Sequence, residues 1–284
     1  MDSSDDLAGW IGRTESLTDQ MTRQTARRAA AMLDLPDADL VDGAAVPQGW
    51  YALLFGPLAP QSQIGPDGHP QRGDFLPPIA LPRRMFAGRR TTFHAPLKIG
   101  DEVERVSEIA RIEPKEGRSG RMIFVTVIHR LRARGTLLVT EEQDIVYRAA
   151  IQPGAAPAAT APQGAPAAPA WTRAARPDAV ILFRYSALTY NGHRIHYDAD
   201  YTRDVEGYPE RVVNGGLTTL LLLEAARAEL RRPFAAVATR NVRPLFVDRP
   251  ISLCGTAAAD GRAQLWVLDA DGALALQASA ELAG

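Results

Sequence analysis

The sequence has a single cysteine, no long apolar run and almost no net charge, and each shortage excludes a class of protein. Cys254 alone cannot form an internal disulfide or a cysteine-based metal site, which fits a reducing compartment. No stretch of about 18 apolar residues is present, so no membrane-spanning helix is predicted. With 32 basic and 33 acidic residues, the net charge of −1 gives no overall field for binding nucleic acid or an anionic membrane.

The N-terminal residues and the surroundings of Cys254 lead to two further expectations. The first ten residues, MDSSDDLAGW, are acidic where a signal peptide would be basic, so we expect a soluble, cytoplasmic protein. Cys254 lies in the strand-like run PISLCGTA, where we expect it to pack as a small apolar side chain and not to act as a nucleophile.

The first half of the chain predicts helices followed by a meander of four strands. Residues 1–20 are predicted to be an irregular lead-in, 22–35 a surface helix, 49–56 a short buried helix and 57–82 a loop rich in Gly and Pro. Four strand-like runs follow: RMFAGRRTTFHAP, EVERVSEIARIEPK, RMIFVTVIHRLRA and TLLVTEEQDIVYR. This order predicts an α+β half in which a sheet curls around a helix.

The second half repeats that plan after a spacer. Residues 150–172 are dominated by Ala and Pro, so they divide the chain into domains at 1–149 and 173–284. A strand is predicted at 181–187 and a buried helix at 215–232, and four strand-like runs follow: AAVATRNVRPLFV, PISLCGTAAA, AQLWVLDA and ALALQASAEL. The shared order predicts a structural duplication, with two unrelated α+β domains as the alternative.

The segment before the helix of the second half is crowded with groups that exchange protons or hydrogen bonds. They are Tyr190, Asn191, His193, His196, Asp198 and Asp200. Imidazole suits acid–base catalysis because its ordinary pKa lies near neutrality. The free N–H groups of Gly215 and Gly216, at the positive end of the helix dipole, offer a site for an oxyanion.

The sequence leaves three interpretations of this segment open: metal binding, acid–base catalysis and a purely structural role. The H-x-x-H-x-D spacing of His193, His196 and Asp198 allows metal ligation, although no third histidine or cysteine is close in sequence. Acid–base catalysis at a thioester uses the same groups, because hydration of a conjugated double bond needs a base, an acid and donors for the enolate-like oxygen. The two histidines could also simply satisfy backbone groups in a tight turn.

The segments LTYNGHRIHYDADY and VEGYPERVVNGGL resemble the MaoC-like hydratases, especially the branch containing mesaconyl-C4-CoA hydratase and hydroxyacyl-thioester dehydratase type 2. The first half resembles the same branch in LPRRMFAGRRTTFHAPLKIGDEVERVSEIARIEPKEGRSG and in VTEEQDIVYR. This resemblance implies a double hot dog fold: two antiparallel sheets, each wrapped around a central helix, fused into one pseudo-dimer. It also implies that the N-terminal half is scaffold and acyl-tunnel wall, and that the C-terminal half is catalytic.

The resemblance also places the catalytic residues. In the wider family the motif D-x-N-P-[I/L]-H carries the catalytic Asp and His, and on this chain the His falls on His196, the Asp on Asn191 and the Asn on His193. Because an amide cannot exchange protons as a carboxylate does, we expect His193 to act as the second acid/base or to orient water, and Asn191 to hold water or substrate. Relatives usually read V-V-H-G-P-L where this chain has V-V-N-G-G-L; Asn214 is a favoured N-cap but cannot be protonated, and Gly216 adds an N–H donor.

The implied substrate is an enoyl thioester of coenzyme A or, less often, of acyl carrier protein, interconverted with its 3-hydroxyacyl thioester without metal or redox cofactor. Expected catalytic groups are His196, His193, Asn191, Gly215 and Gly216. Expected substrate-binding residues are Tyr190, Arg184, Arg84, Asn214, Arg240 and Arg243, and Arg83, Arg89 and Arg90 are further candidates for binding phosphate or carboxylate. If the acyl group carries a second carboxylate, we expect Arg184 or Arg84 to face it.

Two other functions remain as alternatives. One is an acyl-CoA thioesterase with Asp198 as general base, and the other is a catalytically weakened acyl-thioester-binding protein, suggested by Asn191 and Asn214. Since paired hot dogs within one chain mimic a homodimer, both a monomeric pseudo-dimer and a homodimer are expected states.

Overall fold

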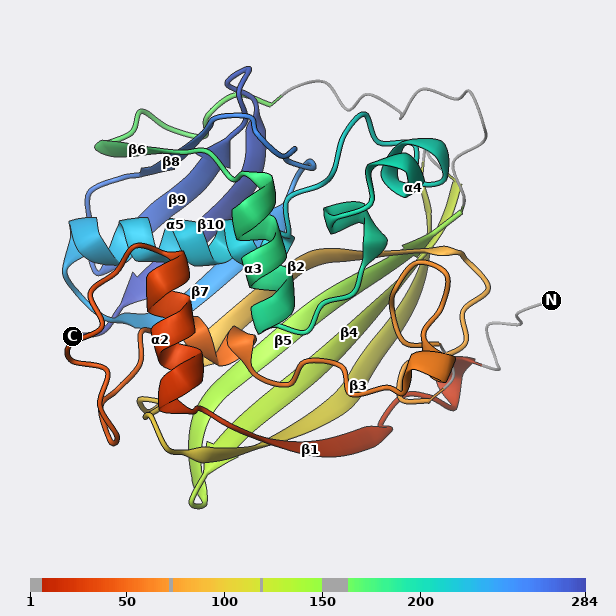
Figure 1. Ribbon diagram of the computed structural model, residues 1–284, viewed down its shortest axis with the longest axis horizontal. Coiled ribbons are helices and arrows are strands. Elements are labelled where there is room, and N and C mark those ends of the chain that lie inside the picture. Colours follow the sequence, from red (N-terminus) through yellow and green to blue (C-terminus); the bar gives the residue numbers. More distant parts are fainter. Residues whose placement is uncertain (1–6, 72–73, 118–119, 150–162) are drawn as a thin grey trace.

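A computed structural model describes residues 7–71, 74–117, 120–149 and 163–284. These residues form a ten-stranded, fully antiparallel sheet in the order β1-β3-β4-β5-β2-β7-β10-β9-β8-β6 (Figure 1). The strands are β1 (Thr14–Gln20), β2 (Arg83–Phe93), β3 (Glu102–Gly117), β4 (Gly120–Ala133), β5 (Thr136–Arg148), β6 (Trp171–Ala175), β7 (Phe234–Asn241), β8 (Ile251–Gly255), β9 (Arg262–Leu268) and β10 (Leu274–Leu282).

The sheet consists of two halves with the same topology, joined edge to edge. The first half has the order β1-β3-β4-β5-β2, and the second half has the equivalent order β6-β8-β9-β10-β7. The halves meet where β2 pairs with β7, for example Arg89 opposite Thr239. The equivalent topologies confirm the predicted duplication and rule out two unrelated domains, and the two halves form one continuous sheet.

The helices lie against one face of this sheet (Figure 1). They are α2 (Arg23–Met32), α3 (Ala179–Leu188), α4 (Ala199–Asp204) and α5 (Gly215–Leu230), with 3-10 turns η1 (Trp50–Leu53), η2 (Gln61–Gln63) and η3 (Arg194–His196). α5 contacts β8 and β9, whereas α2 packs against α3. The second half therefore has the expected central helix, and the helix predicted at 22–35 is present as α2.

α5 confirms the buried helix predicted at 215–232. Leu217, Leu220, Leu222 and Leu223 are all buried, and a buried leucine side chain stabilises a fold by about 1.5–3 kcal/mol. The helix ends at Arg231, which has a left-handed φ of 51° and donates its backbone N–H to the carbonyl of Arg227. Because α5 is fixed along its length by the core, its first residues are held in a defined position.

Two predicted elements are wrong. Residues 181–187 are helical, in α3, because the Asp178 side chain caps the backbone N–H of Ile181, and the buried residues Leu182 and Tyr185 are three apart. In a strand at 181–187, Phe183 would share one face with Ile181 and Tyr185, but in the helix Phe183 is 68% exposed whereas Tyr185 is buried. The lead-in at 1–20 contains the edge strand β1, which lacks an apolar alternation because it pairs with β3 mainly through its backbone.

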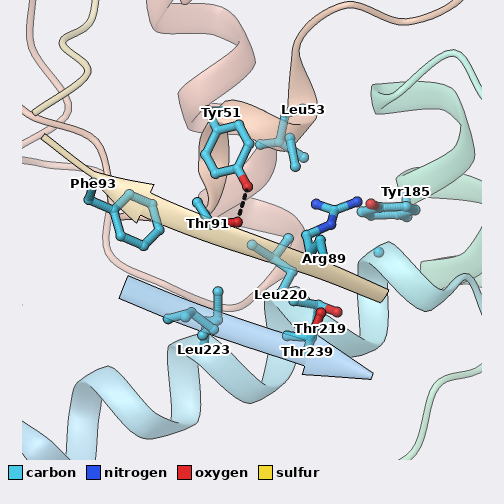
Figure 2. Close-up of a pocket in the computed structure, with 14 residues that line it drawn as sticks. Tyr51, Leu53, Arg89, Thr91, Phe93, Tyr185, Thr219, Leu220, Leu223 and Thr239 are labelled. Atoms are coloured by element: carbon cyan, nitrogen blue, oxygen red, sulfur yellow. Dashed lines mark hydrogen bonds between the residues drawn. The ribbon is translucent and has the colours of Figure 1, made fainter. Parts of the chain in front are cut away.

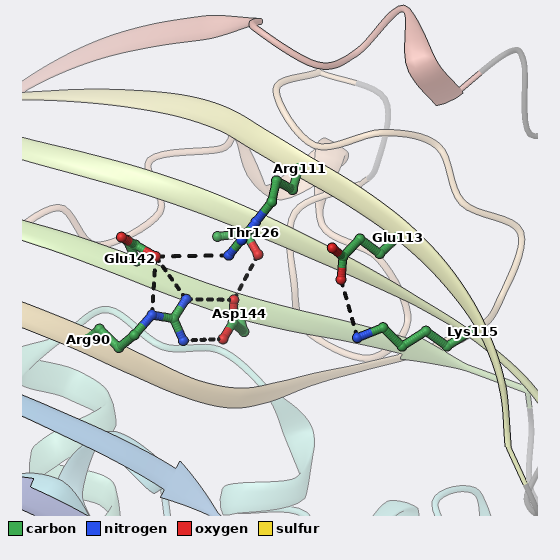
Figure 3. Close-up of polar contacts among 7 residues, drawn as sticks. All are labelled: Arg90, Arg111, Glu113, Lys115, Thr126, Glu142 and Asp144. Atoms are coloured by element: carbon green, nitrogen blue, oxygen red, sulfur yellow. Dashed lines mark hydrogen bonds and ion pairs between the residues drawn. The ribbon is translucent and has the colours of Figure 1, made fainter.

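The face of the first half's sheet turned away from the helices carries a polar cluster that crosses the strands (Figure 3). Arg90 on β2 reaches Asp144 on β5 at 2.7 Å and Glu142 at 3.0 Å, and Thr126 on β4 donates to Asp144 at 2.8 Å. The Arg90 guanidinium is therefore occupied by ion pairs within the sheet.

Three smaller expectations concern the spacer, the cysteine and the membrane. Residues 150–162 of the predicted spacer lie outside the described part of the chain, and its end, Trp171, already belongs to β6. Cys254 is buried with Trp266 and Leu274, as expected of a packed apolar side chain. Among the described residues, no helix has the length and apolar character needed to cross a bilayer.

Candidate active site

His196 occupies a buried position just before α5. Its Nδ1 lies 2.8 Å from the carbonyl oxygen of Val212, so Nδ1 donates and Nε2 keeps its lone pair. The backbone N–H of Val212 in turn bonds the carbonyl of Ile195 at 2.9 Å, which holds η3 beside the chain entering α5. Burial lowers the pKa of His196 to about 4, against the opposing effect of the Val212 hydrogen bond, so the ring is neutral at pH 7.

His193 lies at the start of η3 and contacts two other imidazoles. Its ring centroid is 5.4 Å from that of His196, edge on, and 4.1 Å from that of His69. Burial lowers the pKa of His193 to about 2, with the charges of His69 and His196 acting in the same direction. The structure thus brings the two predicted histidines together and adds a third.

Asp67 and His69 are site residues that the sequence reasoning missed. They lie in the 57–82 loop of the first half, where Asp67 accepts hydrogen bonds from the backbone N–H of His69 at 3.0 Å and from its Nδ1 at 3.1 Å. Burial would raise the pKa of Asp67, but the hydrogen bonds from His69 outweigh it and lower that pKa. The sequence feature that could have indicated them is an Asp two positions before a His in a long loop, because long loops are often functional.

The loop reaches His193 through a close contact between two glycines. A Cβ on Gly68 would lie 1.9 Å from the carbonyl oxygen of Gly192, so only glycine fits there. The backbone N–H of Arg194 also donates to the carbonyl of Asp67 at 2.9 Å, and its side chain donates to the carbonyl of Pro66 at 3.1 Å. The first half therefore contributes side chains to this cluster.

The residues predicted as metal ligands do not converge as a set. His196 Nδ1 is bonded to Val212, and Asp198 is paired with Arg194 at 2.7 Å. A different group, Asp67, His69 and His193, has ligand atoms that all lie within 4.8 Å of one another. These three could hold a metal ion, but Asp67 Oδ2 and His69 Nδ1 are already hydrogen-bonded to each other.

The other residues of the polar segment have local roles. The Asn191 side-chain oxygen accepts the backbone N–H of His193 at 3.0 Å, which shapes the turn that presents the histidines. Tyr190 is 66% exposed with a left-handed φ of 52°. Asp198, the base that a thioesterase would need, also caps α4 through the backbone N–H of Tyr201, and this bond and Arg194 lower its pKa.

The N-terminus of α5 lies at Asn214, Gly215 and Gly216, beside the Tyr185 hydroxyl. Asn214 is its N-cap residue, and its Nδ2 lies 3.4 Å from Ser186 Oγ. Within the described part of the chain its side chain makes no capping hydrogen bond and its buried Oδ1 has no partner. A Cβ on Gly216 would lie 2.1 Å from the hydroxyl oxygen of Tyr185, so that hydroxyl sits directly at the helix tip. The N–H groups of Gly215 and Gly216 lack intrahelical acceptors, as at every helix start.

The four arginines predicted to bind substrate are dispersed. Arg184 is exposed beside Arg27 and Arg28 of α2, on a surface depression separate from α5, and Arg84 is half-buried and close enough to lower the pKa of His193. Arg240 donates to Gln277 at 3.1 Å, and Arg243 pairs with Asp269 at 3.3 Å. Of the four, only Arg84 therefore lies near the histidines.

A small cavity of about 20 Å³, with room for about one water molecule, lies between α5 and strands β2 and β7 (Figure 2). Gly216 and Tyr185 line one end, where Arg89 points toward the Tyr185 hydroxyl, and Phe93 and Leu223 line the other end. The residues that line this cavity do not include His193 or His196.

Comparison with known proteins identifies the family. The model of the hydroxyacyl-thioester dehydratase type 2 family matches residues 49–247. A mesaconyl-C(4)-CoA hydratase of Chloroflexus aurantiacus is 46% identical over 99% of this chain and 100% of its own length. The predicted resemblance, and with it the predicted hydratase and dehydratase class of enzyme, is confirmed.

Solved structures support the fold. A MaoC-like dehydratase from Phytophthora capsici superposes with a TM-score of 0.71 at 15% identity, covering 99% of each chain. A Mycobacterium tuberculosis protein described as a double hot dog fold superposes with a TM-score of 0.64 at 15% identity, covering 98% of each chain. Together with the sheet topology and the family match, these likenesses lead to one conclusion: the chain is a double hot dog protein and belongs to the hydroxyacyl-thioester dehydratase type 2 family.

Proposed function

We propose that the protein is a hydro-lyase that reversibly adds water to a 2-enoyl-CoA thioester, such as mesaconyl-CoA, and gives the 3-hydroxyacyl-CoA. The observation that carries this proposal is the position of His196. Its Nδ1–H is fixed on the Val212 carbonyl, and Val212 lies two residues before the N-cap of α5. The free Nε2 is therefore a neutral base held next to a helix N-terminus that can bind an oxyanion.

The reaction needs one proton removed and one proton added. His196 Nε2 takes a proton from water as the water oxygen bonds to C3 of the enoyl group, and the electrons of the double bond move onto the thioester oxygen. The N–H groups of Gly215 and Gly216 stabilise that oxygen. Protonation of C2 by the imidazolium of His196, directly or through His193, completes the addition and returns the neutral base.

The first half supplies the carboxylate that Asn191 lacks. Asp67 accepts from His69 Nδ1, and the His69 ring lies against His193, so negative charge stabilises protonated imidazole within the cluster. Asp67 and His69 orient His193 in this scheme, and Asn191 sets the turn that carries it. Asn214 Oδ1 is buried and has no partner among the residues that the structure describes, so it can accept a hydrogen bond from water or substrate.

The finer expectations are part of the same proposal. The substrate is a coenzyme A thioester, no metal or redox cofactor takes part, and the protein acts in the cytoplasm as a monomeric pseudo-dimer or a homodimer. Residues 1–149 form one domain and residues 173–284 the other, with a spacer between them. The Asp67, His69 and His193 group gives a direct test, because a chelator should leave turnover unchanged if the chemistry is metal-free.

A single assay separates the candidate functions. Mesaconyl-CoA, crotonyl-CoA and itaconyl-CoA are supplied in turn, and the enoyl absorbance and free thiol are followed together. Hydration removes the absorbance without releasing thiol, a thioesterase releases thiol, and a binding protein does neither. A His196→Ala variant should lose about 10²–10⁴-fold in kcat, whereas His94→Ala, on an exposed ring bonded to Thr140, should retain activity. Equal activity of wild type and His196→Ala contradicts the proposal.

A further inference from the structure

The cluster of Asp67, His69 and His193 has a set of donor atoms that suits a zinc-type ion. Each residue offers one ligand atom, and these atoms all lie within 4.8 Å of one another. Imidazole nitrogens and a carboxylate oxygen are common ligands of Zn²⁺, whereas Mg²⁺ and Ca²⁺ prefer oxygen ligands alone. Three protein ligands occupy three corners of a tetrahedron, and a water molecule completes the coordination.

The spacing of Asp67 and His69 already fits such an ion. Asp67 Oδ2 lies 3.1 Å from His69 Nδ1. In a tetrahedral site with bonds of about 2.0–2.1 Å, neighbouring ligand atoms lie about 3.3 Å apart. A metal ion can therefore replace the proton between these two atoms with little movement of either side chain. The displaced proton passes to Nε2 of the same ring, so the His69 ligand is a neutral imidazole.

The backbone that carries the three ligands is fixed, and their side chains are accessible. The N–H of Arg194 donates to the carbonyl of Asp67 at 2.9 Å, and the N–H of His193 donates to the Asn191 side chain at 3.0 Å. These bonds hold the first-half loop beside the segment that bears His193. The side chains of Asp67 and His69 are 28% and 25% exposed, so an ion can reach them from solvent.

We propose that Asp67, His69 and His193 bind a divalent zinc-type ion, and that the bound ion inhibits the enzyme. The metal site is independent of the proposed function, whereas the inhibition rests on it. A bound ion takes the lone pair through which His193 relays a proton. It also replaces the hydrogen bond between Asp67 and His69 that orients His193. The ion is an inhibitor and not a cofactor, so the hydration chemistry itself stays metal-free.

A binding measurement with Zn²⁺ alone tests the site. Protein freed of metal with EDTA is titrated with Zn²⁺ by calorimetry, and with Co²⁺ in parallel, because a tetrahedral Co²⁺ site absorbs visible light strongly. Wild type should bind a single equivalent of either ion. His69→Ala and Asp67→Asn should weaken binding about 100-fold or more, since even partners of the ligands contribute about 10–100-fold. His94→Ala removes an exposed imidazole bonded to Thr140 and should bind like wild type. Wild type that binds no tighter than the two ligand variants overturns the site.

Inhibition is measured as the ratio of turnover without Zn²⁺ to turnover with saturating Zn²⁺, so a lower basal kcat of a variant does not affect it. The ratio should be about ten or more for wild type and His94→Ala, because an acid–base group is lost, and about one for His69→Ala. EDTA should restore the wild-type rate. Turnover by wild type that saturating Zn²⁺ leaves unchanged overturns the inhibition but not the hydratase proposal.

The two proposals can fail separately. If no thioester is hydrated, the proposed function fails, whereas a bound equivalent of Zn²⁺ that is lost in both ligand variants still establishes the site. Circular dichroism confirms that each variant is folded. Zn²⁺ should also raise the melting temperature of wild type and not that of His69→Ala, because an ion that binds only the folded state stabilises it.

Discussion

The imidazole rings of His69 and His193 lie 4.1 Å apart at an angle of 44°, although they belong to different halves of the chain. The 57–82 loop carries His69 to that place, with Asp67 bonded to its other side. The equivalent topologies of the two halves do not imply equal roles. The first half supplies a carboxylate and an imidazole, and the second half supplies His193, His196 and the tip of α5.

Removal of either loop residue should slow turnover. Asp67→Asn keeps the size of the side chain but loses the charge, and His69→Ala removes the ring against His193. We expect kcat for enoyl-CoA hydration to fall about 10–100-fold in each, below the 10²–10⁴-fold typical of losing a primary acid–base group. Steady-state kinetics measure this, with His94→Ala as control for a lost exposed imidazole. Unchanged kcat in both loop variants would show that the first half is only scaffold.

The contact between Gly68 and Gly192 gives a second prediction. Gly68→Ala and Gly43→Ala both place a side chain at a left-handed φ, 88° and 82°, which costs about 1–2 kcal/mol. Only at Gly68 would the Cβ also meet a backbone carbonyl, 1.9 Å away, whereas Gly43 has open space. Gly68→Ala should therefore separate the loop from His193 and lower kcat, while Gly43→Ala should lower only the melting temperature. Similar kcat values for the two variants would contradict this account.

The buried histidines predict how stability depends on pH. Burial lowers the pKa of His196 and of His129 to about 4 and that of His193 to about 2, below the usual 6.5 of an unfolded chain. Below pH 6.5 the unfolded state therefore binds more protons than the folded state. The contribution of these histidines to the free energy of unfolding is greatest above that pH. As the pH falls toward 4 it should decrease, by up to about 1.4 kcal/mol per pH unit for each histidine.

Urea unfolding between pH 7 and pH 4 measures this slope. His196→Asn should lower the change in the free energy of unfolding per pH unit by the amount that one histidine contributes, because an amide does not titrate. A His94→Asn variant is the control for loss of an exposed imidazole. A free energy of unfolding that stays constant over this range would mean that the rings are not buried in neutral form.

The polar cluster on the outer face of the sheet predicts a mild variant. Arg90→Ala breaks contacts with Glu142 and Asp144 that are partly exposed, so the loss in the free energy of unfolding should be about 0–1 kcal/mol. KM for the CoA thioester should not change, because Arg90 is occupied within the sheet. A large rise in KM would instead place Arg90 at the phosphates of the ligand.

Much of the fold could be predicted from the sequence. Eight of the strands lie in the runs predicted as two groups of four, because apolar alternation and turn residues mark them locally, and the leucines of α5 mark a buried helix. The motif around His196 identified the family, and the comparisons confirm it. α3 was misread because a short apolar run has no clear period, and β1 was missed because an edge strand needs only a partner's backbone.

The sequence by itself determined the duplicated α+β plan, the family, and the two histidines before the α5 helix, because these depend on local patterns and spacing. Only the tertiary structure decided which distant groups meet: Asp67 and His69 with His193, and Arg89 with Thr239 and Tyr185. The physical reason is that strand pairing and loop packing bring together residues far apart in the chain. A loop fixed by a contact between two glycines leaves no periodic pattern from which its partner could be predicted.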